Sequence, residues 1–250
     1  MKHKRLWGVL LCLSFLLILF NTSSFALEEG GYVGAPFWND ANTVWNFLRN
    51  FNYEQFYWAY DFMFRNMNNY FVDDMDIAYY CGYGFWTRWV TVFGTWPWWW
   101  SPVDYAYFGN SGHRGYGDVD LEFLVMHASY SIPTPWSVWD WYSAWITEPN
   151  DIFDGMHQLH GFWTPRYYYT APRISRNYGW MVSRGFNMWF SWNFSVWRYG
   201  ARIYWWPWPW SWLIERGAVV MWPPSMWDRY WAMWCPDPPQ NHTWLWFWYQ

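Results

Sequence analysis

The sequence predicts an α/β fold with a mostly parallel central sheet, and three observations lead to it. Short apolar segments alternate along the chain with longer segments of helical pattern, as in proteins whose strands are linked by helices. Two of the apolar segments, Ile77–Tyr80 and Leu121–Met126, run directly into short turns, which is typical of buried strands. The 250-residue chain also shows no internal repeat and no dividing linker, so we expect one domain with a sizeable core.

The first 26 residues are predicted to be a secretory signal peptide rather than part of the fold. Residues 2–5 form a basic start, Leu6–Phe20 is apolar but shorter than a usual membrane span, and residues 24–26 follow the A-x-A-like pattern of a cleavage site. We therefore expect residues 27–250 to form a single secreted or periplasmic domain, located in the cell envelope or outside it, without a stable membrane span. An uncleaved N-terminal anchor is the alternative.

The expected elements follow in a regular order. Strands are expected where apolar runs are bounded by glycine, proline or polar residues, and helices where a polar cap precedes apolar positions three or four apart. The strands are 31–37, 72–80, 121–126, 161–164 and 217–221, the last stopped by Pro223 and Pro224. The helices are one beginning at Asn39 or Asp40, one over 54–67, one from Asp151 or Asp154 through Leu159, and one over 175–190.

The charge of the chain argues against nucleic acid as a partner. Without the three basic residues of the signal, 12 arginines and no lysine face 19 acidic residues, for a net charge of −7. Binding to nucleic acid depends on neutralising phosphates, which an acidic chain without a basic run does poorly.

Tryptophan is the most unusual feature of the composition. The chain has 31 tryptophans, with dense runs at Trp96–Trp100 and Trp205–Trp210. A single domain cannot fully bury so many large rings, and exposed aromatic patches usually mark binding surfaces. Compositional drift is the alternative explanation. The candidate binding residues of this type are Trp86, Trp98, Trp99 and Trp100.

Two turns lie where function is expected in a parallel sheet. Gly82–Gly84 and His127–Ser129 each follow a predicted strand directly. Loops at the carboxyl ends of parallel strands carry the functional residues of such folds. We expect the two turns to face each other across one crevice.

Four segments in this order resemble the caspase-like cysteine peptidase fold. They are "FVDDMDIAYYCGYG", "DLEFLVMHASYSIP", "FDGMHQLHGFWT" and "RGAVVMWPP". The chain is similar, more closely, to a poorly characterised secreted family of that architecture, which has a Gly-Leu-His block leading into a Gly-Phe-x-Thr strand. The resemblance covers residues 31 to 237 and implies a three-layer caspase-like domain. Its peptidases carry histidine in a Gly-His-Gly turn and cysteine in an Asp-Ala-Cys turn.

The resemblance also implies a degenerate catalytic site in this chain. Tyr83 stands in place of the histidine, Ser129 in place of the cysteine, and His127 in place of the aspartate before it. A serine depends heavily on a nearby base, and a tyrosine is mostly protonated at neutral pH. The predicted function is therefore that of a peptidase-like domain without its dyad. It would bind or scaffold an extracellular protein or polysaccharide through the crevice and the tryptophan-rich loops, without a cofactor.

Two other functions stay open at this point. The first is a serine-type hydrolase in which His113, from the glycine-rich loop 109–118, or His127 serves as the base for Ser129. The second is an aromatic-rich module that binds polysaccharide or the envelope surface.

His157 and His160 are further candidates for the crevice. They are three apart in a segment expected to be helical, so they would share one face. Together with His127 they could make a three-histidine metal site, but the flanking glutamate of zinc-peptidase helices is missing. We expect instead that one of them packs beside the strand ends and hydrogen-bonds the crevice loops, and we predict no metal.

Two smaller features complete the sequence reading. Cys81 and Cys235 either form a disulfide or remain two buried thiols. The acidic cluster of Asp73, Asp74 and Asp76 is expected to be a solvated entrance to the strand that follows it.

Overall fold

The computed structural model describes ten segments of the chain. They are residues 28–34, 38–64, 67–86, 91–94, 105–107, 115–117, 119–137, 152–202, 214–231 and 245–250. The predicted signal peptide, His113, Cys235 and Trp98–Trp100 lie outside the described residues, as does the side chain of Trp86.

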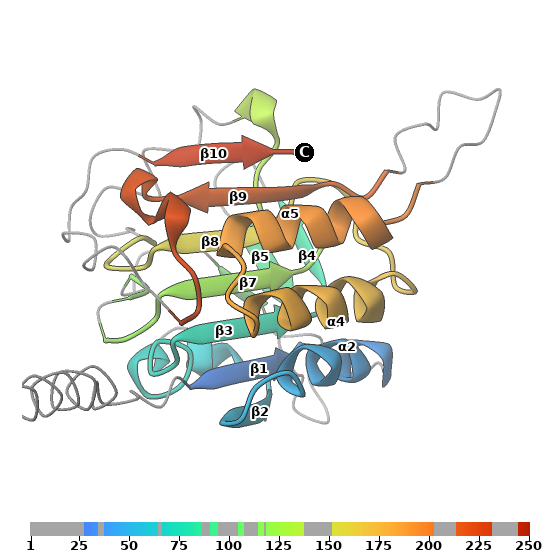
Figure 1. Ribbon diagram of the computed structural model, residues 1–250. Coiled ribbons are helices and arrows are strands. Elements are labelled where there is room, and N and C mark those ends of the chain that lie inside the picture. The colour runs from blue at the N-terminus through green and yellow to red at the C-terminus, as the bar shows by residue number, and fades with distance from the viewer. Residues whose placement is uncertain are drawn as a thin grey trace, which may run out of the picture.

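A seven-stranded sheet forms the centre of the molecule (Figure 1). Its strand order is β10-β9-β8-β7-β3-β1-β2. The strands are β1 (Glu29–Val33), β2 (Glu54–Trp58), β3 (Ile77–Cys81), β7 (Phe123–His127), β8 (Gln158–Phe162), β9 (Gly217–Met221) and β10 (Trp246–Tyr249). Neighbours from β2 to β8 pair in parallel, whereas β9 is antiparallel to both β8 and β10. The prediction of an α/β fold with a mostly parallel sheet is confirmed.

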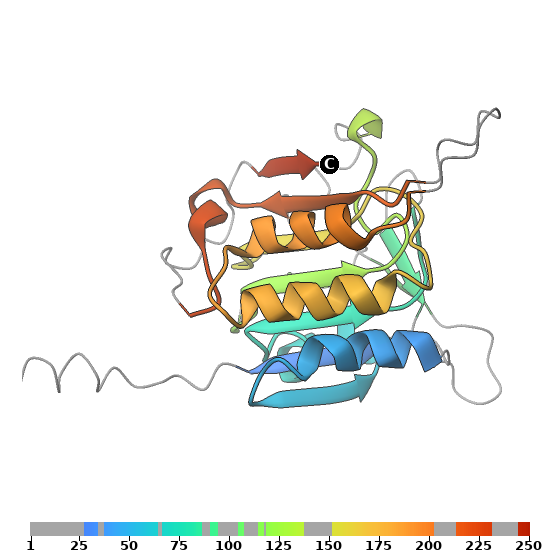
Figure 2. The same ribbon diagram turned by 45° about the vertical axis from the view of Figure 1, so that its right-hand side comes forward.

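Three helices cover one face of this sheet, as Figures 1 and 2 both show. They are α2 (Trp38–Leu48), α4 (Ala171–Val182) and α5 (Met188–Tyr199), with α4 between the other two. Close packing of α2 requires glycine in β1, since a Cβ at Gly31 would lie 2.7 Å from Leu48 Cδ1. The buried cluster on this side includes Phe47, Tyr79, Tyr178 and Trp192.

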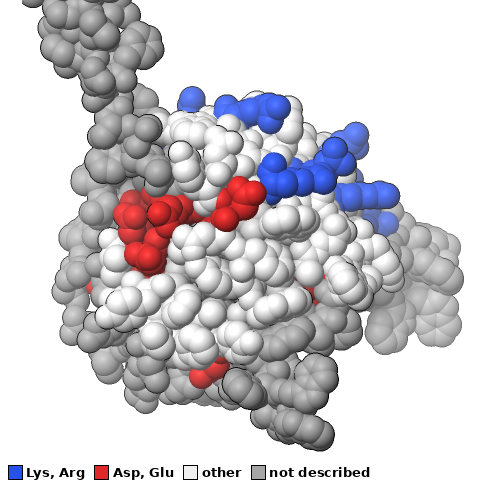
Figure 3. Space-filling view, turned by 90° about the horizontal axis from the view of Figure 1, so that it is seen from below, with Lys and Arg blue, Asp and Glu red and all other residues white. Residues whose placement is uncertain are grey.

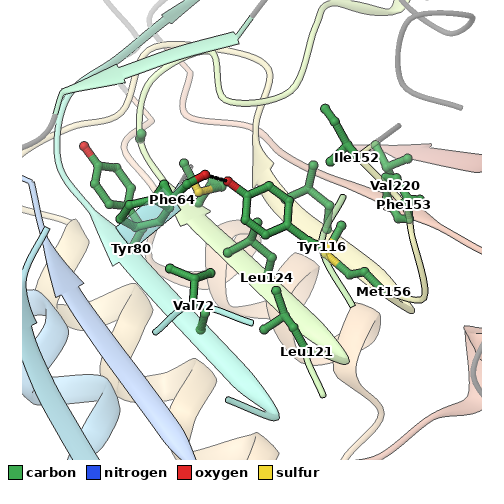
Figure 4. Packing of buried hydrophobic residues seen from close by; sticks show 14 of the residues in the cluster. Phe64, Val72, Tyr80, Tyr116, Leu121, Leu124, Ile152, Phe153, Met156 and Val220 are labelled. Atoms are coloured by element: carbon green, nitrogen blue, oxygen red, sulfur yellow. Dashed lines mark hydrogen bonds between the residues drawn. The ribbon is translucent and has the colours of Figure 1, made fainter. Parts of the chain in front are cut away.

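Among the described residues, the opposite face is covered by short 3₁₀-helices and loops. Asp61–Phe64 and Asn68–Tyr70 lie in this layer with segments 115–117 and 152–156. Tyr116 packs in the cluster shown in Figure 4, and its hydroxyl donates to the Phe64 carbonyl at 2.7 Å. The domain thus has three layers, of which the third is irregular.

The remaining short elements lie beside this framework. A small antiparallel sheet consists of β4 (Gly84–Trp86), β5 (Thr91–Gly94) and β6 (Tyr105–Tyr107). Two further 3₁₀-helices are Pro135–Ser137 and Pro223–Trp227. Of these elements, β4 is the one next to the predicted functional turns, because it begins at Gly84, within the turn that follows β3.

Three expected helices differ from the structure. Residues 54–67 contain strand β2 and a 3₁₀-helix, because Glu54, Phe56 and Trp58 alternate with more buried residues at the sheet edge. The segment ending at Leu159 is a loop leading into strand β8. The single helix over 175–190 is two helices, separated at Gly185, whose φ of +76° a helix cannot continue through.

Two members of the acidic cluster before β3, Asp73 and Asp76, are buried rather than solvated, whereas Asp74 is exposed as expected. Asp73 accepts the amide protons of Gly117 and Val119, the second at 3.1 Å, and Asp76 accepts that of Glu28 at 2.6 Å. These carboxylates join loops at the amino edge of the sheet. Burial raises the pKa of Asp76 to about 7, with the Glu28 amide acting in the opposite direction.

Glu29 is a buried carboxyl group at the same edge and yields a testable prediction. Neither carboxylate oxygen has a hydrogen-bond partner among the described residues, and burial, followed by the charges of Asp76 and Glu54, raises its pKa to about 8. The unfolded chain ionises near 4.5, so folding is increasingly opposed as the pH rises from 4.5 to 8. Glu29→Gln should therefore gain stability over the wild type by about 2 kcal/mol across this range, less than the full shift implies because water can reach an ionised group.

Urea denaturation at several pH values measures this difference, with the exposed Asp74→Asn as the control, because Asp74 is not among the charges that raise the pKa of Glu29. A difference between Glu29→Gln and the wild type that does not change with pH would refute the assignment.

Candidate functional site

The two predicted turns meet at the carboxyl edge of the sheet. Strands β3 and β7 are neighbours in register, with Cys81 opposite His127. The turns that follow them are in direct contact, because a Cβ at Gly84 would lie 2.6 Å from the Ser129 carbonyl oxygen. Tyr83 is 54 % exposed in this turn, and its carbonyl accepts the Tyr80 hydroxyl at 3.0 Å.

Ser129 is held by the backbone of the loop after β8. Its Oγ accepts the amide proton of Arg166 at 2.9 Å. This bond joins the β7 turn to the β8 loop and uses one lone pair of the hydroxyl. It supplies no base, because an amide donates a proton and does not accept one.

His127 points into the core on the helix side of the sheet. Its Nδ1 lies 2.5 Å from the Tyr79 hydroxyl, and its ring packs against Phe162 and edge-on to Trp192. Burial, and secondly the charge of Arg166, lowers its pKa well below the ordinary value, so the imidazole is neutral. His127 is therefore hydrogen-bonded to Tyr79, and Ser129 to the Arg166 amide. The two side chains do not hydrogen-bond each other.

A buried ion pair that the sequence did not reveal lies beneath these turns. The Arg166 guanidinium contacts Asp40 Oδ1 at 2.8 Å through Nη2, and Cys81 Sγ at 2.7 Å and the His127 carbonyl at 3.3 Å through Nη1. We call Arg166, Asp40 and Cys81 the arginine anchor. It joins the start of α2, the end of β3, the end of β7 and the loop after β8.

The anchor determines the state of its thiol. Cys81 is a free cysteine and fully buried, and it donates to Asp40 Oδ1 at 3.5 Å. Burial raises its pKa well above the ordinary value, and Asp40 adds to this while Arg166 opposes it. A protonated, buried thiol is a poor nucleophile, so Cys81 is not placed to act as one.

His157 and His160 lie in the core and not on a crevice wall. They belong to the β8 region instead of a helix, which corrects the expected shared face. His160 is held by Gln158 at 2.9 Å and Tyr178 at 3.0 Å, and burial lowers its pKa to about 3. Both histidines are fully buried, so neither side chain is placed to contact a ligand at the surface.

His157 lies between two carboxylates at the amino edge of the sheet. Its Nδ1 is 2.7 Å from Asp228 Oδ2, and its Nε2 is 3.0 Å from Glu122 Oε2. Burial alone would lower its pKa, but the contacts with Asp228 and Glu122 outweigh it and raise the pKa to about 9. His157 is thus a buried cation. Within the described part of the chain, no three histidine, cysteine or acidic side chains gather as a metal site.

Exposed aromatic side chains surround the arginine anchor. Trp38 is 90 % exposed and lies two residues before Asp40, Tyr83 lies two residues after Cys81, and Tyr168 lies two residues after Arg166. Tyr169 is 75 % exposed beside Tyr168, its ring nearly perpendicular to that of its neighbour. We call these four residues the aromatic rim. The Asn39 side chain donates to the Tyr168 carbonyl, which joins the loops of Trp38 and Tyr168 directly.

The composition pointed to exposed aromatic residues but to different positions. The tryptophans proposed from the densest runs, Trp98–Trp100, lie outside the described residues, as does the side chain of Trp86. The rim residues were not singled out, apart from Tyr83. The sequence feature that could have identified the rim residues is their position, since each follows a predicted strand or lies at the start of a predicted helix.

Comparison with known proteins adds no family to this description. No family model matches the chain, and no curated protein is significantly similar to it. Among the described residues, no helix has the length and apolar character needed to cross a membrane.

Proposed function

We propose that this chain is a secreted, non-catalytic binding protein of caspase-like architecture, with its ligand on the aromatic rim. One observation carries the proposal. The buried Arg166–Asp40 pair and Cys81 hold three loops together, and each of these loops presents an exposed aromatic ring two residues away. Rigid aromatic side chains on preorganised loops make effective binding surfaces because little entropy is lost on contact.

The polar groups of the same region support a role without catalysis. A general base must lie within hydrogen-bond reach of its nucleophile, yet Ser129 receives the Arg166 amide and His127 is bonded to Tyr79. The thiol of Cys81 is buried and protonated. Among the described residues at this edge, Asp40, Cys81, His127 and Arg166 thus serve the fold, while the side chains of the aromatic rim face solvent.

The ligand that best suits the rim is a polysaccharide. Trp38, Tyr83 and Tyr169 are exposed rings carried by three different parts of the chain, the start of α2, the turn after β3 and the loop after β8. Sugar rings combine an apolar face with a polar edge, which matches the apolar body and polar tip of tyrosine and tryptophan. Export by the predicted signal peptide would bring the domain to the extracellular or periplasmic space where such polymers occur.

Active-site probes test the absence of catalysis. A fluorophosphonate labels an activated serine, and an acyloxymethyl ketone labels an activated cysteine. Neither should label the purified protein, whose folded state is checked by near-ultraviolet circular dichroism. Fluorophosphonate labelling that disappears in Ser129→Ala would instead establish a serine hydrolase.

Native gels cast with soluble polysaccharides test the ligand. A polysaccharide that retards the wild type should retard the Trp38→Ala/Tyr169→Ala variant at least tenfold more weakly, as expected for interface aromatic residues. Trp227→Ala is the matched control, because Trp227 is 66 % exposed but lies at the amino edge of the sheet. Equal loss in both variants, or no retardation by any polysaccharide, would contradict this proposal.

A further inference from the structure

A second site lies on the helix face, away from the aromatic rim. A groove of about 760 Å³ runs over α4 and is lined by residues from the ends of α2 and α5 as well. Its described lining residues are Arg49, Asn50, Arg173, Arg176, Asn177, Trp180 and Tyr199. It contains three arginines, and no carboxylate is among these residues.

The arginines of the groove are not neutralised by neighbouring acids. Arg49, Arg173 and Arg176 are all exposed, and no described carboxylate forms an ion pair with any of them. Figure 3 shows most of the basic side chains of one face on one side and most of the acidic ones on the other, with the two groups meeting at a common border. In a chain with a net charge of −4, such a group is a local concentration of positive charge.

The helical period explains why these side chains share one surface. Arg173, Arg176 and Trp180 are spaced by three and four residues along α4, so they lie on one face of the helix. The opposite face of α4 is buried through residues such as Ile174 and Tyr178. Arg184 extends the positive surface beyond the helix, with its guanidinium 4.5 Å from the centre of the Trp180 ring.

The two asparagine side chains of the groove are already engaged. The Asn50 amide donates to the carbonyls of Asn46 and Phe47, and the Asn177 amide donates to Ser195 Oγ at 2.9 Å. These bonds fix the walls of the groove. The three guanidinium groups are therefore the ones left to bind a ligand.

From these observations we infer that the groove binds a soluble ligand that carries at least two phosphate groups. The guanidinium group presents a planar fork of donors that pairs with two oxygens of a phosphate at once. Three guanidinium groups, carried by α4 and the end of α2, suit a ligand with several linked anionic groups better than a ligand with a single anionic group. The groove is concave and bounded by three helices, which favours a compact soluble ligand over the flat surface of a membrane. The groove shares no residue with the aromatic rim, so binding of phosphate here is independent of the proposed function.

Calorimetric titration with sodium tripolyphosphate tests the inference. The wild type should bind, and the Arg173→Ala/Arg176→Ala variant should bind at least tenfold more weakly. Arg229→Ala is the matched control, since Arg229 is exposed but does not line the groove, and its affinity should stay within twofold of the wild type. Binding should also weaken as salt is raised, because exposed charges are screened.

Three results would overturn the inference. The first is no binding of tripolyphosphate to the wild type. The second is the same loss in Arg229→Ala as in the double variant, which would indicate attraction by overall charge alone. The third is binding to vesicles of anionic phospholipid without binding to tripolyphosphate, which would make the phosphate that of a lipid headgroup. Trp38→Ala/Tyr169→Ala should bind tripolyphosphate normally, so this test and that of the rim can fail separately.

Discussion

Replacing Arg166 by methionine is expected to lower the free energy of unfolding by about 4 kcal/mol, because it leaves the Asp40 carboxylate buried without a counterion. The Asp40 side chain is only 1 % exposed, and the Arg166 side chain 7 %. The same substitution removes the contacts with Cys81 Sγ and the His127 carbonyl. Chemical denaturation at pH 7 measures the loss.

Two further variants separate the ion pair from simple packing. Adding Asp40→Asn to Arg166→Met should restore part of the stability, since no uncompensated charge then remains in the core. Arg229→Met changes an exposed arginine and should stay within about 0.5 kcal/mol of the wild type. A loss below about 1 kcal/mol in Arg166→Met would show that Asp40 finds water or another partner, and the arginine anchor would lose its proposed role.

Raising the pH from 6.5 to 9 is expected to destabilise the protein through His157. The pKa of this histidine is 6.5 in the unfolded chain and about 9 in the folded protein. The contribution of protonated His157 to the free energy of unfolding is therefore complete below pH 6.5 and is lost as the pH rises through 9. At about 1.4 kcal/mol per unit of pKa, the loss amounts to about 3 kcal/mol for this fully buried side chain.

The pH dependence must be assigned to His157 by a variant, because Glu29 titrates over part of the same range and in the same direction. In His157→Gln the stability should fall by about 3 kcal/mol less between pH 6.5 and 9 than in the wild type. His160→Gln is the control. The pKa of His160 is about 3, so this variant should be less stable but keep the wild-type pH dependence. Equal slopes in the wild type and His157→Gln would mean that His157 is neutral.

The strands that could be predicted from the sequence are those with unbroken apolar runs. Strands β3 and β9 are fully buried and their sequences are apolar or aromatic throughout, and Gly82 and Pro223 mark where they end. Strand β7 is equally buried and is apolar up to His127, its last residue. Strand β8 was predicted only at its end, as residues 161–164, because Gln158 and His160 interrupt its apolar pattern. Those polar side chains are tolerated in the core because they bond each other and Tyr178, which is a contact with a distant helix.

The location of the site was predicted better than its chemistry. The turns of Tyr83 and Ser129 were expected at the same edge of the sheet, and they are in contact there. The pairing of Arg166 with Asp40 could not be predicted, because it depends on how α2 and the loop after β8 come together in space. From local sequence alone, Asp40 indicated only the start of a helix.

The burial of Cys81 has a practical consequence for following motion at this edge of the sheet. A thiol reagent can reach this sulfur only when the arginine anchor opens, so its rate of reaction in a Cys235→Ser background counts the openings. A rate that tracks global unfolding would mean that the three aromatic loops open only when the whole domain does. A faster rate, insensitive to low denaturant, would show that the loops separate as a local unit while the sheet stays folded.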